Sequence, residues 1–221
     1  MAFGSILQLQ VGELAIEIAP LTREVMGDFV SPGIQSAHIT RYLETSAKVL
    51  EDEYEWFDKI RTDTTSITWG VYILRGAERE LIGTTSLHHL HKDFFYTAGS
   101  GSLIFKREYW GQGIASAIHQ ARTWYGFHIV GLDRIWSEVL HGNPASRRAL
   151  EKSGYYVTHV KRNVKFADGK LRHSDQLECI NPSDAVWKRW WGSDRPGKAA
   201  REARARTQAA LDWASANVTL P

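Results

Sequence analysis

The residues whose types and spacing best suit chemistry in this sequence are two glycines, Gly111 and Gly113, separated by Gln112. Ser102 to Phe105 precede them as a short apolar stretch typical of a strand, and a helical pattern begins at Ile114. The first N–H groups of a helix lack intrahelical acceptors and lie at the positive end of its dipole, so they bind anions such as phosphate. Because glycine has no Cβ, the backbone of such a turn can approach the anion closely. The sequence therefore predicts an anion site at this turn.

A second motif runs from Asn143 to Tyr155. Asn143 followed by Pro144 is a typical helix start, because asparagine caps the first turn and proline fits the first helical position. Gly154 is a typical residue just beyond a helix C-terminus. The motif therefore predicts a short helix that directly follows a strand.

The elements that must position these motifs are predicted from hydrophobic periodicity and turn residues. Strands are predicted at Leu14 to Ala19, Ile67 to Leu74, Leu81 to Leu90, Ser102 to Phe105, Arg134 to Leu140, Tyr155 to Phe166 and Leu171 to Ile180. Helices are predicted at Thr22 to Phe29, Ser46 to Arg61, Ile114 to His128, Asn143 to Gly154 and Lys198 to Ala216. Turns at Arg75 to Glu80 and around Asp168-Gly169 predict two hairpins, and His91 to Gly101 is predicted to be a loop. Thr22 is the expected N-cap of the first helix, and Ser31-Pro32-Gly33 is expected to break it.

The C-terminal part of the chain differs in composition after Asn181-Pro182. Trp187, Trp190 and Trp191 lie beside basic residues, and an Ala/Arg-rich helix follows. We therefore predict a domain at residues 1–181 and a helical extension at residues 182–221. Its tryptophans are expected to pack on the domain or on a second copy in a homodimer. Without a broader basic surface, nucleic acid is not an expected partner.

The two motifs together resemble a known family. They read Glu-Tyr-Trp-Gly-Gln-Gly-Ile-Ala from Glu108 to Ala115, and Asn-Pro-Ala-Ser-Arg-Arg-Ala-Leu-Glu-Lys-Ser-Gly-Tyr from Asn143 to Tyr155. In this order they resemble the GNAT family of N-acetyltransferases, especially its ribosomal-protein-alanine-acetyltransferase-like branch. The resemblance covers about Leu14 to Ile180 and implies a mixed α/β fold of the α+β type. Helices would flank a mostly antiparallel, twisted central sheet whose central strands splay apart, and the helical extension would follow.

The resemblance also implies that acetyl-CoA is the acyl-donor substrate, with its diphosphate on the glycine turn and its pantetheine arm between the splayed strands. Arg148, together with Lys106 or Arg107, would meet the nucleotide phosphates. The residues implied in acetyl-CoA binding are Leu103, Ile104, Phe105, Arg107, Tyr109, Trp110, Gly111, Gln112, Gly113, Ile114, Ala115, Ser116, Asn143, Ser146 and Arg148.

Transfer to an amine requires a neutral amine, a stabilised oxyanion and protonation of the leaving thiolate. A backbone N–H near Leu103 to Phe105 can serve the oxyanion. Many members of the family place a tyrosine acid where this chain has Leu150, which leaves Ser146 as the best donor to the thiolate. The alternative is that Ser146 only satisfies a backbone group in the first helical turn.

The general base is harder to assign than the acid. Some relatives have a glutamate on the central strand, but the aligned position in this chain is about Ser100. Glu138 and His141 are candidates. The cluster His88, His89 and His91 is another, although strand alternation predicts that His88 and His89 point to opposite faces. A chain of water molecules could also replace a dedicated base. The histidine cluster also resembles a metal site but lacks acidic or cysteine ligands at a fitting spacing, so no metal is expected.

These features favour an N-acetyltransferase whose acceptor is a primary amine: a protein N-terminus, an amino-acid derivative, a polyamine or an antibiotic. The alternative is a non-catalytic acyl-CoA-binding protein that acts in interaction or regulation, which the missing tyrosine and missing glutamate keep open. A Rossmann or P-loop nucleotide site is not matched, since the third glycine and the Gly-Lys-Ser/Thr sequence are missing.

Composition bounds these hypotheses. The 221 residues are 43% hydrophobic and 24% charged, with a formal net charge of +2, which is typical of globular proteins and gives no reason to expect nucleic acid or membrane binding. The single cysteine, Cys179, excludes an internal disulfide and suits a reducing compartment. The N-terminus lacks the basic region of a signal peptide, and no apolar run approaches the roughly 18 residues of a membrane span. We therefore predict a cytoplasmic protein.

Overall fold

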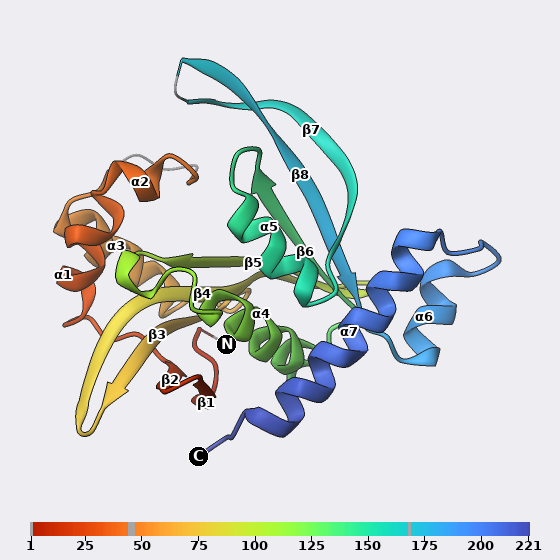
Figure 1. Ribbon diagram of the computed structural model, residues 1–221, viewed down its shortest axis with the longest axis horizontal. Coiled ribbons are helices and arrows are strands. Elements are labelled where there is room, and N and C mark those ends of the chain that lie inside the picture. The colour runs from red at the N-terminus through yellow and green to blue at the C-terminus, as the bar shows by residue number, and fades with distance from the viewer. Residues whose placement is uncertain (1, 44–46, 168) are drawn as a thin grey trace. The chain divides into compact units, whose positions relative to one another are not determined.

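The computed structural model describes residues 2–43, 47–167 and 169–221, and within them the chain has a mixed α/β fold (Figure 1). The strands are β1 (Leu7–Val11), β2 (Leu14–Ala19), β3 (Ile67–Arg75), β4 (Glu78–Lys92), β5 (Tyr96–Ile104), β6 (Arg134–Leu140), β7 (Tyr156–Ala167) and β8 (Lys170–Ile180). Their order in the sheet is β1-β2-β3-β4-β5-β6-β8-β7. The β5–β6 pair is parallel, and the β1–β2, β2–β3, β3–β4, β6–β8 and β7–β8 pairs are antiparallel. The predicted fold class, with a mostly antiparallel sheet and flanking helices, is therefore confirmed.

The helices are α1 (Met26–Asp28), α2 (Ala37–Thr40), α3 (Leu50–Ile60), α4 (Ile114–Trp124), α5 (Pro144–Lys152), α6 (Asp184–Trp191) and α7 (Lys198–Asn217). Predicted helices overlap α1, α3, α4, α5 and α7, whereas α2 and α6 were not predicted. Short irregular helical turns occupy Phe29–Ile34, Arg107–Tyr109 and Tyr125–Val130. The last of these ends at Gly131, whose φ of 78° is the left-handed conformation that glycine adopts readily.

Three predictions about elements were wrong. Residues predicted as a loop belong to β4 and β5, and β5 begins at Tyr96 rather than Ser102, because Thr97, Ala98 and Gly99 pair with β6. Thr22 does not cap α1, which begins at Met26; the Thr22 hydroxyl instead hydrogen-bonds the Glu24 carboxylate. The amphipathic helix begins at Leu50, and Ser46 lies outside the described residues.

Strand β1 was not predicted at all, although Leu7, Leu9 and Val11 alternate with polar residues. The predicted break after the first helix is confirmed, since Ser31 has the extended angles φ −125° and ψ 121°.

By internal packing the described chain divides into two compact units. The first comprises residues 1–88, 101–114 and 217–221, and the second residues 89–100 and 115–216. In the first unit a core of aromatic and aliphatic side chains lies under α1, α2 and α3. Its members include Leu21, Met26, Phe29, Ile39, Ile60, Tyr72, Leu81 and Phe105.

A β-bulge in β4 decides which residues face this helical layer. Tyr72 of β3 pairs with Leu81, whereas the next residue, Val71, pairs with Gly83, so Ile82 is the extra residue. The backbone carbonyl of Ile82 accepts a hydrogen bond of 3.0 Å from the N–H of Phe105 instead. Because side chains alternate along a strand, one extra residue reverses the faces of all residues that follow it.

The second unit contains β6, β8 and β7 with the C-terminal helices, and its long β7–β8 hairpin extends beyond β6 in Figure 1. The tail packs within this unit, since Trp190 contacts Phe95 with ring centroids 4.9 Å apart. Helix α7 lies so close to Gly154 that a Cβ there would come within 2.6 Å of the Thr207 backbone nitrogen. The predicted boundary at residue 181 and the homodimer both stay predictions.

Candidate functional site

The glycine turn has the backbone that the sequence analysis requires for an anion site. Gly111 has φ 78° and Gly113 has φ 86°, angles that side chains with a Cβ rarely adopt, and α4 begins at the next residue. Within the described part of the chain, no protein group accepts a hydrogen bond from the N–H groups of Gly111, Gln112 or Gly113. These amides and the first amides of α4 are therefore available to an anion.

The residues before the turn are held by a polar network on the β3–β4 hairpin. The Lys106 ammonium lies 2.6 Å from Glu80, and the Tyr109 hydroxyl donates a hydrogen bond of 2.5 Å to the same carboxylate. Arg75 in turn donates to the Tyr109 hydroxyl over 2.8 Å. Hydrogen bonds from Lys106 and then from Tyr109 lower the pKa of Glu80 below its usual value. Lys106 is thus engaged with Glu80, and the network positions the turn.

The side chains around the turn differ in exposure. Phe105, Tyr109 and Ile114 were predicted to bind acetyl-CoA, and their side chains are buried in the core. Trp110 is exposed, and its indole N–H donates to the Ile104 carbonyl over 2.9 Å. The Arg107 guanidinium lies 5.6 Å from the centre of the Trp110 ring. Arg107 is therefore close to the turn but not engaged with a carboxylate in any recorded contact.

The central strands β5 and β6 pair over only a short ladder, as expected if they splay apart. β5 and β6 pair at Thr97, Ala98 and Gly99, opposite Arg134, Ile135 and Trp136, and the recorded ladder ends there. On its other edge β6 pairs with β8 as far as Leu140. The Ser137 hydroxyl donates to the Ser100 carbonyl over 3.2 Å just beyond the last pair. A short parallel ladder of this kind is what a splayed pair requires.

The second motif forms the predicted helix cap. The Asn143 side-chain oxygen accepts a hydrogen bond of 3.2 Å from the Ser146 N–H, and α5 begins at Pro144. Among the described residues, no hydrogen bond from the Ser146 hydroxyl to a protein group is recorded. Arg148 is exposed on the same helix. The catalytic role of Ser146 and the phosphate role of Arg148 stay predictions.

The two candidate bases on and beyond β6 are already paired within the second unit. Glu138 lies 3.0 Å from Lys161 and accepts a short hydrogen bond from Ser174. Burial raises the pKa of Glu138, but hydrogen bonds from Ser174, Gln176 and Lys161 outweigh it, so the net direction is downward. His141 lies 3.0 Å from the Asp175 carboxylate, which also pairs with Arg147. A carboxylate with a lowered pKa is a weak base. The catalytic roles of Glu138 and His141 stay predictions.

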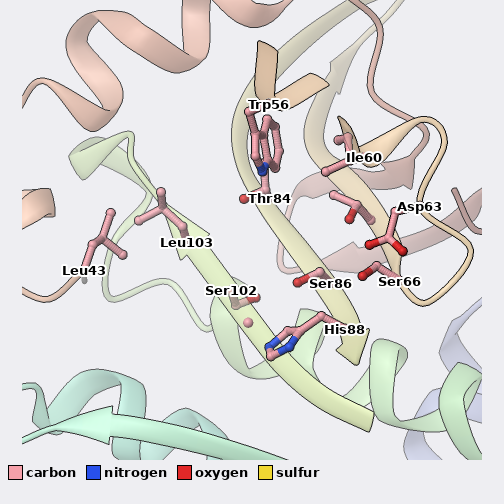
Figure 2. A pocket seen from close by; sticks show the side chains of 12 residues that line it. Leu43, Trp56, Ile60, Asp63, Ser66, Thr84, Ser86, His88, Ser102 and Leu103 are labelled. Atoms are coloured by element: carbon pink, nitrogen blue, oxygen red, sulfur yellow. The ribbon is translucent and has the colours of Figure 1, made fainter. Parts of the chain in front are cut away.

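A cavity of about 400 Å³ opens in the first unit between α3 and the sheet (Figure 2). Its floor crosses three strands and is mostly polar. The floor residues are Thr68 on β3, Thr84, Ser86 and His88 on β4, and Gly101, Ser102 and Leu103 on β5. Leu43, Trp56 and Ile60 supply apolar walls, and Asp63 and Ser66 lie on the side opposite Leu43 and Leu103 in Figure 2.

The β4 bulge is the reason that these polar residues face the cavity. Thr84 pairs with Gly70 and Ser86 pairs with Thr68, so they share the face of Leu81 and Tyr72. Without Ile82 as the extra residue, Thr85 and Leu87 would face this way. Both are fully buried on the other side instead.

The three histidines of β4 are separated by the same alternation. His88 lines the cavity. His89 has φ 52° and stacks on Trp136 in the second unit, with ring centroids 6.2 Å apart, and His91 is exposed. The prediction that His88 and His89 do not act together therefore agrees with their different surroundings.

Asp63 is fixed by the turn that joins α3 to β3. The N–H and the hydroxyl of Thr65 both donate to its Oδ1 over 2.7 Å. Hydrogen bonds from Ser66 and then from Thr65 lower the pKa of Asp63, so it is ionised at neutral pH. Asp63, Trp56 and Ser86 were not among the site residues predicted from the sequence. Polar residues at alternate positions of a buried strand were the feature of the sequence that indicates the floor of the cavity.

Helix α3 also buries an acidic side chain, Glu53, which is 5% exposed. Burial raises its pKa to about 7. The folded state therefore binds a proton that the unfolded state releases between about pH 4.5 and 7, and stability falls as pH rises through this window. We expect Glu53→Gln to raise the free energy of unfolding by about 2 kcal/mol at pH 8 and to leave it unchanged at pH 4.

Urea unfolding of this variant at both pH values measures the effect. Glu55→Gln on the exposed side of α3 is the matched control and should match the unsubstituted protein at pH 8. Equal stabilities of Glu53→Gln and the unsubstituted protein at pH 8 would contradict the prediction that ionisation of the buried Glu53 carboxyl group destabilises the fold.

Two negative findings concern the described residues alone. No three His, Cys, Asp or Glu side chains lie together there in a way that could hold a metal ion. No helix among these residues combines the length and apolar character needed to cross a membrane.

Comparison with known proteins gives a family match and two bacterial relatives. A model of the acetyltransferase (GNAT) domain matches residues 16–156. The uncharacterized N-acetyltransferase YoaA of Bacillus subtilis (strain 168) is 29% identical over 128 residues, which are 58% of this chain and 70% of that protein. The probable N-acetyltransferase YjcK of the same organism is 33% identical over 113 residues, 51% of this chain and 61% of that protein.

Solved structures with the same fold include two from bacterial enzymes. Spermidine N-acetyltransferase from Vibrio cholerae, in complex with CoA and spermine, has a TM-score of 0.67 at 19% identity, covering 75% of this chain and 95% of that one. Mycobacterium smegmatis RimJ, in complex with CoA-disulfide, has a TM-score of 0.69 at 16% identity, covering 91% and 94%. At these identities the likeness concerns the fold.

Proposed function

The chain belongs to the GNAT acetyltransferase family, and from this premise we propose that it transfers the acetyl group of acetyl-CoA to a primary amine. One observation supports this most: the glycine turn with unpaired amides and the cavity belong to the same compact unit. The chain from Gly101 to Gly113 connects them, since its first residues line the cavity and its last form the turn. An anion site and an acceptor site joined by a short segment suit a two-substrate transfer.

The proposed donor site uses the backbone. The diphosphate of acetyl-CoA binds the amides of Gly111, Gly113 and the start of α4. The thioester lies along the end of β5, where the backbone N–H of Leu103 or Ile104 stabilises the oxyanion. The N–H of Phe105 is not a donor there, because it donates to the Ile82 carbonyl. Arg107, exposed beside the turn, is the proposed partner of a phosphate.

The proposed acceptor site is the cavity, with His88 as general base. In the reaction the amine nitrogen forms a bond to the acetyl carbonyl carbon, and the bond between that carbon and sulfur breaks. His88 takes the proton that the nitrogen loses, and the sulfur leaves as a thiolate that gains a proton, for which Ser146 is the proposed donor. Imidazole suits the first task because its ordinary pKa lies near neutral pH.

The motif Asn143 to Tyr155 supports placement in the ribosomal-protein-alanine-acetyltransferase-like branch, and one structural neighbour is RimJ. Another neighbour is a spermidine acetyltransferase. The amine is therefore either a protein N-terminus or a small-molecule amine. Turnover of acetyl-CoA against a panel of both kinds tests the proposal. Binding of acetyl-CoA without turnover on any amine would favour a non-catalytic acyl-CoA-binding protein.

Substitution of the proposed acid gives a specific prediction. We expect Ser146→Ala to lower kcat about 10- to 100-fold, because the thiolate leaves without a positioned proton donor. The affinity for acetyl-CoA should fall by a smaller factor than kcat, because the proton donation is needed only as the thiolate leaves. Steady-state kinetics measure both. Ser183→Ala is the control, since Ser183 lies at the start of another helix, α6, and makes no side-chain cap. Unchanged kcat in Ser146→Ala would remove Ser146 from the mechanism.

A further inference from the structure

We infer that the acceptor is a linear diamine whose non-reacting ammonium group binds at Asp63. This inference rests on the proposed function, because it assigns a substrate class to the same cavity. It follows from the polarity of the floor, the charge of the lining residues and the distance across the strands.

The polarity of the floor is unusual for a sheet face beneath a helix. Such a face is normally apolar, because its side chains form the core between the two layers. Here Thr68, Thr84 and Ser86 lie side by side across β3 and β4, while Trp56 and Ile60 form apolar walls of the cavity. A floor lined by hydroxyl groups between apolar walls suits a flexible ligand that is apolar along its length and polar at its ends.

The ionisable residues that line the cavity can balance one positive charge on a ligand. Of the described residues that line the cavity, only Asp63 and His88 have ionisable side chains. A diamine has two ammonium groups, and the one that reacts must lose its proton before it attacks the thioester. A single ammonium group then remains on the ligand, and the Asp63 carboxylate balances its charge.

Asp63 lies on the opposite side of the cavity from β5, so the ammonium group at Asp63 and the reacting amine are at opposite ends of the ligand. Asp63 and Ser66 precede β3, whereas Gly101 and Leu103 lie on β5, on the opposite side of β4. Figure 2 shows Asp63 and Leu103 on opposite sides of the cavity, with Ser86 between them. Two strand spacings amount to roughly 10 Å, which a chain of about four to six carbon atoms bridges when contact distances at both ends are included.

The same lining disfavours two other acceptors. A free α-amino acid carries a carboxylate beside its amine, and no Lys or Arg among the described residues lines the cavity to pair with it. Longer polyamines carry further ammonium groups, for which the described lining offers no second carboxylate. A buried charge without a partner is costly in either case.

The experiment compares 1,4-diaminobutane with 1-aminobutane, which has the same length but lacks the second amine. We expect kcat/KM for the diamine to exceed that for the monoamine at least tenfold, the usual contribution of a charge-assisted hydrogen bond. In Asp63→Asn this preference should vanish while acetyl-CoA binding is unchanged, because asparagine keeps the acceptor for Thr65. Asp58→Asn is the matched control, since Asp58 pairs with Arg23 and Arg61 and does not line the cavity.

Other outcomes separate this inference from the proposed function. If amines are acetylated but the monoamine reacts as well as the diamine, or Asp63→Asn keeps the preference, the diamine assignment is wrong and the acetyltransferase stands. Preference for a free amino acid or for spermine would also overturn it. If no amine is acetylated, calorimetric binding of 1,4-diaminobutane to the unsubstituted protein and to Asp63→Asn still decides the inference. Equal affinities would refute it, and weaker binding to the variant would support it.

Discussion

Gly113→Val is expected to weaken acetyl-CoA binding about 100- to 1,000-fold, the equivalent of losing one or two charge-assisted hydrogen bonds. Gly113 has φ 86°, an angle that a β-branched residue does not tolerate, so the turn must change its path. The nearest side-chain atom to an added Cβ is 3.9 Å away, on Val11, so the substitution acts through the backbone angle rather than through a collision. Isothermal titration with acetyl-CoA measures the change.

Gly192→Val is the matched control for this substitution. Gly192 also has positive φ, at 55°, with no atom within 4 Å of an added Cβ, and it ends α6 in the second unit. The control should bear the same kind of backbone strain and bind acetyl-CoA normally. Binding by folded Gly113→Val within threefold of the unsubstituted protein, on the order of 0.6 kcal/mol, would contradict the proposed diphosphate site.

His88→Gln is expected to lower kcat about 100- to 1,000-fold, the usual contribution of a positioned general base. Glutamine keeps a polar side chain on the cavity floor but cannot accept a proton at neutral pH. Initial rates at saturating acetyl-CoA measure the effect.

His91→Gln is the control for the general base, because His91 lies on the same strand and is exposed. Its kcat should match that of the unsubstituted protein. If His88→Gln retains most of the rate, a water chain or another group accepts the proton, and His88 is only part of the floor.

The sequence predicted the structure best where that structure depends on residues close together in the chain. Gly111 and Gly113 require positive φ, Asn143 and Pro144 mark a helix start, and each motif is complete within one turn and its neighbouring helix. Strand β6 and the hairpin of β3 and β4 were also predictable, because apolar and β-branched residues alternate between clear turn residues. In these segments local preference and tertiary structure agree.

The first half of β5 was not predictable in this way. Tyr96 to Gly101 is rich in small and polar residues, whose intrinsic preference is for turns. It forms a strand because Thr97, Ala98 and Gly99 pair with β6, a contact with residues far away in the sequence. Small residues also fit where backbones approach closely, as at Gly83, where a Cβ would lie 2.1 Å from the Leu103 carbonyl oxygen.

The cavity was beyond the reach of sequence patterns for a related reason. Simple alternation places Leu81 and His88 on opposite faces of β4, and the bulge at Ile82 places them on the same face. Trp56, Asp63 and His88 come from a helix, a loop and a strand that no local pattern joins. The candidate bases Glu138 and His141 looked equally suitable in the sequence, and their pairing with Lys161 and Asp175 became visible only in three dimensions.

The central claim is that unpaired amides at the start of α4 bind the diphosphate of acetyl-CoA. Amide chemical shifts of ¹⁵N-labelled protein, recorded during titration with CoA, test this most directly. The account predicts that the largest changes occur at Gly111, Gln112, Gly113, Ile114 and Ala115, and that they are lost in Gly113→Val. Saturable binding of CoA that leaves these five amides unchanged would contradict it.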